Sequence, residues 1–120
     1  MKQHHKSAKV SDLAHHLRFS TDGTRRLLRR EGIDPTSQHP LRYRWQDVWE
    51  LEGLLLVASD DIETFIAPLL TVSDVQRRYF PDLSTRTITG QAASGRLPGI
   101  KIGSDWRFRE SDMRRAVRDA

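Results

Sequence analysis

Apolar positions recur at helical spacing in two pairs of short segments, one pair in each half of the chain. In each pair a leading segment is expected to begin at Ser11 or Ser73, and a second segment covers 24–31 or 86–94. The residues expected to face inward are Leu13, Ala14, Leu17, Leu27 and Leu28 in the first pair, and Val75, Tyr79, Ile88 and Ala92 in the second. Ser11 and Ser73 are expected to cap the leading helices, because a serine hydroxyl accepts a hydrogen bond from a backbone N–H at a helix start.

A strand pattern follows the second segment of the later pair. Gly95 is expected to end the helix in the left-handed conformation, as Gly32 is in the earlier pair. Two short apolar runs, 100–102 and 106–108, then flank residues 103–105, which predicts a β-hairpin with a three-residue loop. Because side chains alternate along a strand, this register fixes two faces. It places Ile100, Ile102, Trp106 and Phe108 on an inward face, and Lys101 and Arg107 on an outward face.

The two halves also repeat each other in sequence. Three matches carry the repeat: Val-Ser-Asp at 10–12 and 72–74, an aromatic-Arg-aromatic triplet at 43–45 and 106–108, and an acidic-apolar pair at 47–48 and 112–113. The hairpin segment of the first copy contains Pro35 and Pro40 and is longer, so a looser hairpin is expected there. Arg42 and Arg44 are expected to be its outward cations.

This repeat predicts a mainly α fold with small β-hairpins, organised as two units. Their expected bounds are 1–58 and 71–120, with a connector over 59–70. The segment 48–70 is too apolar for a flexible tether. It is expected to close the first unit with a helix and then to pack between the units, and its apolar surplus is equally compatible with a dimer face.

Charge is segregated along the chain. Residues 1–44 hold ten Lys or Arg against four Asp or Glu, residues 45–76 hold none against seven, and residues 77–120 hold ten against five. The net charges of these blocks are therefore +6, −7 and +5, which sum to the total of +4. Two basic blocks around an acidic one indicate two surfaces that meet a polyanion, joined by a segment that faces away from it.

Composition excludes several kinds of function. The chain has 120 residues, of which 37% are hydrophobic and none is cysteine, so disulfides, thiolate metal sites and cysteine nucleophiles are absent. The histidine pairs 4–5 and 15–16 are expected on the surface, because neighbours on a helix point about 100° apart and do not share one metal ion. No phosphate-binding loop or nucleophile motif is present. We therefore expect no enzyme, no cofactor and no small-molecule ligand.

The apolar runs are also too short for a membrane protein. None approaches the roughly 18 residues that span a bilayer, and the first ten residues lack the apolar core of a signal peptide. The expected location is the cytoplasm, in association with the nucleoid.

The second half resembles a known family. Over residues 69–117 the order is a leading helix, Ser-Thr-Arg-Thr at 84–87, Ser-Gly-Arg-Leu-Pro at 94–98, Lys-Ile-Gly at 101–103, the triplet at 106–108 and an acidic start to a last helix. This order resembles the winged helix-turn-helix of the excisionase and MerR-like group. The first half looks like a more divergent copy, without the Leu-Pro and the short wing. The resemblance implies a tandem winged helix-turn-helix that binds double-stranded DNA.

Such a fold places the second helix of each unit in the major groove and the hairpin, or wing, along the phosphates or in the minor groove. The candidate DNA-binding residues of the first copy are Thr24, Arg25, Arg26, Arg29, Arg30, Arg42 and Arg44. Those of the second copy are Ser84, Thr85, Arg86, Thr87, Thr89, Gln91, Arg96, Lys101, Ser104 and Arg107. For Ser84 and Thr85 helix capping is an equal alternative. Gly90, inside the presumed recognition helix, indicates either a short helix or a close backbone approach.

Three functions agree with these patterns. The first is an excisionase-type recombination directionality factor of a mobile element, with an integrase or recombinase, or further copies of itself, as partners on DNA. The second is a small transcriptional regulator of a phage, plasmid or integrative element, with a small terminase subunit as a minor variant. The third is a winged-helix protein-interaction module whose basic faces are incidental.

Overall fold

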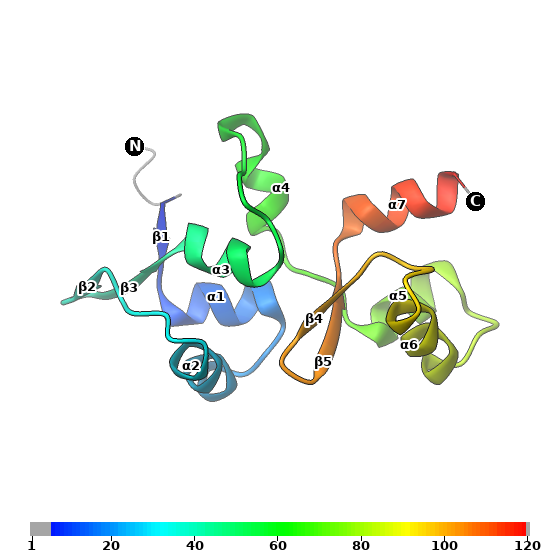
Figure 1. The fold of residues 1–120 in the computed structure, drawn as a ribbon, viewed down its shortest axis with the longest axis horizontal. Helices are drawn as coiled ribbons and strands as arrows, with labels where there is room; N and C mark the ends of the chain where they lie inside the picture. The colour runs from blue at the N-terminus through cyan, green and yellow to red at the C-terminus, as the bar shows by residue number, and fades with distance from the viewer. Residues whose placement is uncertain (1–5, 120) are drawn as a thin grey trace. The chain divides into compact units, whose positions relative to one another are not determined.

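The computed structural model describes residues 6–119, and the chain forms two compact units, Met1–Pro68 and Leu69–Ala120. Both are mainly helical, with small antiparallel sheets. In each unit two helices are followed by a two-stranded hairpin and then by a further helix (Figure 1). The coarse prediction of a mainly α fold with small hairpins is therefore confirmed.

The first unit begins with the strand β1 (Ser7–Ala8) and the helices α1 (Val10–Leu17) and α2 (Thr21–Arg30). The expected inward residues, Leu13, Ala14, Leu17, Leu27 and Leu28, are all buried. Between the two helices the backbone reverses through Arg18, whose φ of 64° lies in the left-handed region. At Gly32, φ is 71°, which confirms the left-handed conformation predicted there.

Both leading helices begin earlier than predicted. In the first unit Lys9 is the N-cap residue, and its backbone N–H donates to the Asp12 carboxylate at 3.2 Å. In the second unit Thr71 is the N-cap, and it exchanges hydrogen bonds with Asp74 in a capping box. The capping prediction for Ser11 and Ser73 is therefore wrong. The Asp that follows each serine bonds to the true N-cap residue, which lies two residues before the serine.

A hairpin completes the small sheet that begins with β1, and a helix follows the hairpin. The strands β2 (Ser37–Gln38) and β3 (Leu41–Arg44) pair antiparallel across a two-residue connection, and β3 also pairs with β1. The helix α3 (Trp45–Leu51) follows directly. Pro35 precedes β2 and Pro40 lies in the connection, so neither proline removes a hydrogen bond from the pairing. The first hairpin is thus short, where a longer and looser one was predicted.

The segment 59–68 belongs to the first unit and is not a separate connector. It contains the 3₁₀ turn η2 (Ser59–Asp61) and the helix α4 (Ile62–Ile66). The indole N–H of Trp49 donates to the Phe65 carbonyl at 3.0 Å, which ties α4 back to α3. Trp49 is buried, at 6% exposure, so this tie lies in the core of the unit.

A buried histidine makes the second tie. The Nδ1 atom of His16 lies 2.7 Å from the Ala67 carbonyl, and its Nε2 atom lies 2.6 Å from the Glu52 carboxylate. His16 is 0% exposed, so the prediction that it lies on the surface is wrong. The helical position of His16 between Leu13 and Leu17 already places it on the apolar face of α1.

The second unit contains α5 (Val72–Tyr79), α6 (Thr85–Ala93), β4 (Gly99–Ile102), β5 (Asp105–Phe108) and α7 (Glu110–Arg118). Its core consists of Leu70, Val75, Ile88, Ala92, Leu97, Phe108 and Met113. Leu70 and Phe108 exchange backbone hydrogen bonds at 2.7 and 2.9 Å, so Leu70, two residues before α5, extends the hairpin as β1 extends the first one. Gly95 has a φ of 84°, as predicted.

The second hairpin has a different register from the predicted one. Ile102 pairs with Asp105, so the loop consists of Gly103 and Ser104 alone. Lys101 therefore lies opposite Trp106, and Ile100 lies opposite Arg107. A one-residue shift moves every side chain of a strand to the other face. The predicted pairing of Lys101 with Arg107 on one outward face is wrong for this reason.

The repeat itself is shifted by two residues at its C-terminal end. Arg44 and Arg109 are the N-cap residues of α3 and α7, and each forms an ion pair with the aspartate three residues later. Tyr43 therefore corresponds to Phe108, and the match between the triplets at 43–45 and 106–108 is wrong. The predicted match of 47–48 with 112–113 agrees with the helix starts, and Val48 and Met113 are both fully buried.

Candidate nucleic-acid interface

The outward face of α2 carries a dense group of cations. Arg25, Arg26, Arg29 and Arg30 are all exposed, while Leu27 and Leu28 anchor the opposite face in the core. Arg25 forms an ion pair with Asp22 at 3.1 Å, and its side chain remains 50% exposed. Because such surface pairs are weak, the guanidinium can exchange its carboxylate for a phosphate at small cost. This face therefore suits contact with a polyanion.

Thr24 is not part of that face. It is 0% exposed, and its hydroxyl donates to the Ser20 carbonyl at 2.8 Å. The helix begins at Thr21 with Ser20 as its cap, three residues before the predicted start, and this turns Thr24 inward. The prediction that Thr24 contacts DNA is wrong.

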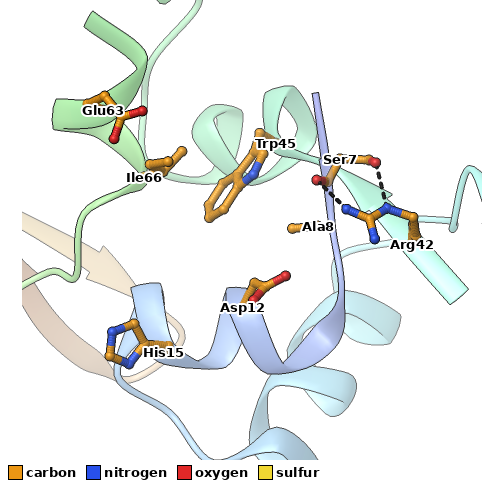
Figure 2. A pocket seen from close by; sticks show the side chains of 8 residues that line it. All are labelled: Ser7, Ala8, Asp12, His15, Arg42, Trp45, Glu63 and Ile66. Atoms are coloured by element: carbon orange, nitrogen blue, oxygen red, sulfur yellow. Dashed lines mark hydrogen bonds between the residues drawn. The ribbon is translucent and has the colours of Figure 1, made fainter. Parts of the chain in front are cut away.

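The two predicted cations of the first hairpin differ in how far their side chains are exposed to solvent. Figure 2 shows that Arg42 reaches back to Ser7 on β1, with Nε 2.8 Å from the Ser7 hydroxyl and Nη2 2.9 Å from its carbonyl. Arg44 is exposed and forms an ion pair with Asp47 at 3.2 Å. Arg42 therefore fastens the sheet, and Arg44 is the hairpin cation that faces solvent.

Two surface hollows among the described residues of the first unit differ in character. One, of about 450 Å³, lies beside Arg42 and is lined by Ser7, Ala8, Asp12, His15, Arg42, Trp45, Glu63 and Ile66 (Figure 2). Its two carboxylates disfavour a phosphate. The other, of about 320 Å³, lies between α2 and β3 and is lined by Arg25, Arg29, Gly32, Ile33, Asp34, Pro35, Leu41 and Tyr43. Its two guanidinium groups outnumber the single carboxylate of Asp34, and beside the apolar wall they suit a sugar-phosphate unit. Sequence reasoning missed this second hollow because α2 and β3 are separated in the chain.

The N-terminus of α6 is built by capping. Ser84 is the N-cap residue, and its hydroxyl accepts a hydrogen bond from the backbone N–H of Thr87 at 3.1 Å and lies 3.0 Å from the Thr87 hydroxyl. The Thr89 hydroxyl donates to the Thr85 carbonyl at 2.9 Å. The hydroxyls of Ser84 and Thr89 thus have structural partners, and Thr85, Arg86 and Thr87 remain exposed.

The outward side of α6 is also flat at Gly90. This residue is exposed, and apart from its chain neighbours and the backbone of its own helix no heavy atom lies within 4 Å of the position that a Cβ atom would take. Gln91 is half-buried on the same helix. A helix with so little side chain at this position lets another surface approach its backbone closely.

The second hairpin presents one cation, Lys101. Its ammonium lies 5.2 Å from the centre of the Trp106 ring, a distance typical of a cation–π contact. Arg96 and Ser104 are also exposed. Arg107 is only 8% exposed and donates to the Trp106 carbonyl at 2.9 Å, so the prediction of an outward cation there is wrong. Gly103-Ser104 as a two-residue loop was the sequence signal for this register.

Other chemistry is limited in the described part of the chain. Across residues 6–119 no three His, Cys, Asp or Glu side chains converge as a metal site would require, and the pair His4-His5 lies outside this range. Among the helices of the same range, none has both the length and the apolar character needed to cross a bilayer. Burial, with the hydrogen bond and the charge of Glu110, raises the pKa of Tyr79.

Comparison with known proteins adds no assignment. No family model, no curated protein and no solved structure matches this chain.

Proposed function

We propose that this chain binds double-stranded DNA, with each unit acting as a winged helix-turn-helix. The observation that carries the proposal is the exposed arginine face of α2, which stands above an apolar face that fixes the helix. In this proposal α2 and α6 enter the major groove, and Arg44 and Lys101 meet the backbone or the minor groove from the hairpins. The expected role is that of an excisionase-type recombination directionality factor, which bends or coats an attachment site.

The two units have different roles in this proposal. α2 offers four guanidinium groups, which suit phosphate contacts, and the hollow between α2 and β3 adds an apolar wall for a deoxyribose. α6 offers Thr85, Arg86, Thr87 and a bare backbone at Gly90, which suit closer contact with base edges. The first unit therefore supplies affinity, and the second supplies sequence preference.

Salt titration of DNA binding tests the proposal. If each unit neutralises about three to four phosphates, log K falls against log salt with a slope of about −5 to −7. The variant R25Q/R29Q is expected to make the slope shallower by about 2 on any DNA sequence. A parent slope shallower than about −2 would contradict binding through both units.

The matched control is R114Q/R115Q on α7. It removes the same charge, and like the Arg25/Arg29 pair it contains one arginine ion-paired to a nearby aspartate, here Arg115 with Asp112 at 3.6 Å. The control is expected to leave the slope within about 0.5 of the parent value. An equal loss in both variants would show that net charge, and not the α2 face, governs binding.

A transcriptional regulator is the second candidate, because occluding a promoter needs the same surfaces. A footprint on DNA from the protein's own locus, followed by an excision assay with the recombinase encoded there, separates the two roles. Protection of an attachment site with stimulated excision supports the directionality factor. Protection of a promoter without such stimulation supports the regulator.

A further inference from the structure

Two adjacent leucines of the first unit are exposed to solvent. Leu55 and Leu56, in the segment between α3 and η2, are each 87% exposed. The other large apolar side chains that are exposed in residues 6–119 are Leu41, at 37%, and Val117, at 42%. Burial of a leucine side chain is one of the larger favourable contributions to folding. A neighbouring pair left this exposed indicates a surface that another molecule covers.

The backbone of this segment is held in place. Gly53 adopts a φ of 86°, and the N–H of Leu54 donates to the Trp49 carbonyl at 2.9 Å, which closes the end of α3. The Gln46 side-chain amide donates to the Leu55 carbonyl at 3.2 Å. The leucines are therefore displayed by an anchored turn.

Acidic residues flank the pair in the sequence, on both sides. The same Gln46 amide donates to the Glu50 carboxylate at 3.2 Å, so Glu50 lies beside the anchor of Leu55. Asp60 and Asp61 are exposed and begin the next helical turn. The chain has no Lys or Arg from Trp45 to Gln76, so no cation within this segment offsets these carboxylates. These five exposed residues of one segment, Glu50, Leu55, Leu56, Asp60 and Asp61, are together called the acidic leucine turn.

We infer that the acidic leucine turn is a docking site for a cationic amphipathic helix of another protein. The apolar stripe of such a helix would cover Leu55 and Leu56, and its Lys or Arg residues would face Glu50, Asp60 and Asp61. Charge complementarity selects this occupant. A second copy of the turn would bring like charges together, and anionic lipid headgroups or DNA would be repelled for the same reason.

A defined peptide tests the inference on the full-length protein without DNA. The probe is an amphipathic peptide of Leu and Lys, about 18 residues or five helical turns long, and its counterpart has Glu in place of every Lys. Backbone amide shifts are followed by NMR during titration. The expected result is saturable shifts confined to residues around 53–61 with the Leu/Lys peptide, and no such shifts with the Leu/Glu peptide.

Three variants sharpen the test. L55S/L56S is expected to raise the Kd of the Leu/Lys peptide at least about tenfold, because both apolar contacts are lost. E50Q/D60N/D61N is expected to raise the Kd of the Leu/Lys peptide and to make that Kd less dependent on salt concentration. L41S, which alters an exposed leucine of the same unit outside the acidic leucine turn, is the matched control and is expected to bind as the parent does. Amide spectra of all variants report whether the fold is kept.

Four outcomes would overturn the inference. They are shifts spread over the basic helices, equal binding of both peptides, unchanged affinity in L55S/L56S, and equal losses in L55S/L56S and L41S. Two further measurements address other occupants. Concentration-dependent dimerisation in sedimentation velocity that L55S/L56S abolishes would assign the turn to a second copy. Leucine-dependent binding to vesicles of two-thirds phosphatidylcholine and one-third phosphatidylserine would assign it to a membrane.

Discussion

Replacing Glu52 by alanine tests the buried tie of the first unit. The carbonyl of Ala67 can only accept a hydrogen bond, so Nδ1 of His16, 2.7 Å away, must carry a proton. The 2.6 Å contact between Nε2 and the Glu52 carboxylate then holds one further proton, on either the imidazole or the carboxyl group. The side chains of His16 and Glu52 are 1% and 0% exposed, so both polar groups are removed from solvent in the folded unit.

The expected cost of Glu52→Ala follows from this burial. Removing one partner leaves the other buried and unsatisfied, which costs about 1 to 3 kcal/mol for a neutral hydrogen-bonded pair and about 3 to 5 kcal/mol for an ion pair. A small domain has a total stability of about 5 to 15 kcal/mol, so the first unit would lose a large part of its own. Glu52→Gln is expected to cost less, because an amide can still donate to Nε2 of a neutral imidazole.

Urea denaturation followed by tryptophan fluorescence measures both losses. Trp45 and Trp49 report on this site, since the Trp45 ring lies 5.2 Å from that of His16 and 6.0 Å from that of Trp49. Glu50→Ala, an exposed glutamate in the last turn of α3 two residues before Glu52, is the control and is expected to change stability by less than about 0.5 kcal/mol. If Glu52→Ala were no more destabilising than Glu50→Ala, the proposed role of the His16–Glu52 pair in holding 59–68 to the first unit would be refuted.

Three further predictions concern the second unit. Gly90→Ala is expected to raise the melting temperature, because alanine is favoured by about 1 kcal/mol inside a helix and its Cβ would meet nothing within 4 Å beyond its own helix backbone and chain neighbours. The same change is expected to weaken DNA binding measured by anisotropy, and unchanged or stronger binding would show that α6 does not approach DNA there. Lys101→Ala is expected to have a melting temperature close to that of the parent and to bind DNA less tightly. Arg107→Ala is expected to lower the melting temperature. The reverse pattern would contradict the hairpin register. Because the pKa of Tyr79 is raised in the folded state, an unfolded chain loses this proton first, at about pH 10, so the stability that Tyr79 contributes is lost as pH rises above that value. Tyr79→Phe should flatten the decline of the urea midpoint above pH 10, and an unchanged decline would count against this linkage.

The buried faces of the helices and their C-terminal ends could be predicted from the sequence. The inward positions Leu27, Leu28, Ile88 and Ala92 are buried, because a spacing of three to four residues leaves a short helix one face for the core. The left-handed conformation of Gly32 and Gly95 could also be predicted, because glycine adopts a positive φ without the steric cost that other residues meet.

Three features needed more than local patterns. The hairpin register depended on whether Asp105 belongs to the loop or to β5, and that single position decides which of Lys101 and Arg107 faces solvent. The helix starts depended on Asp12 and Asp74, each of which accepts a hydrogen bond from a backbone N–H three residues earlier. Lys9 has no capping preference that would mark this start, whereas Thr71 is itself a favoured N-cap residue. The attachment of 59–68 depended on His16 and Trp49, whose partners lie far along the chain and leave no periodic signal.

If the chain binds DNA as proposed, the unequal outward faces of α2 and α6 would have a kinetic consequence on a long duplex. Contacts between arginines and phosphates are the same at every step along DNA, so the first unit could keep hold while the protein slides between neighbouring sites. The small polar groups and bare backbone of α6 gain contacts only where the base edges fit, so the second unit would arrest that movement at its target. Search and arrest would then reside in separate halves of one short chain, and weakening the arginine face would slow target location before it changed target choice.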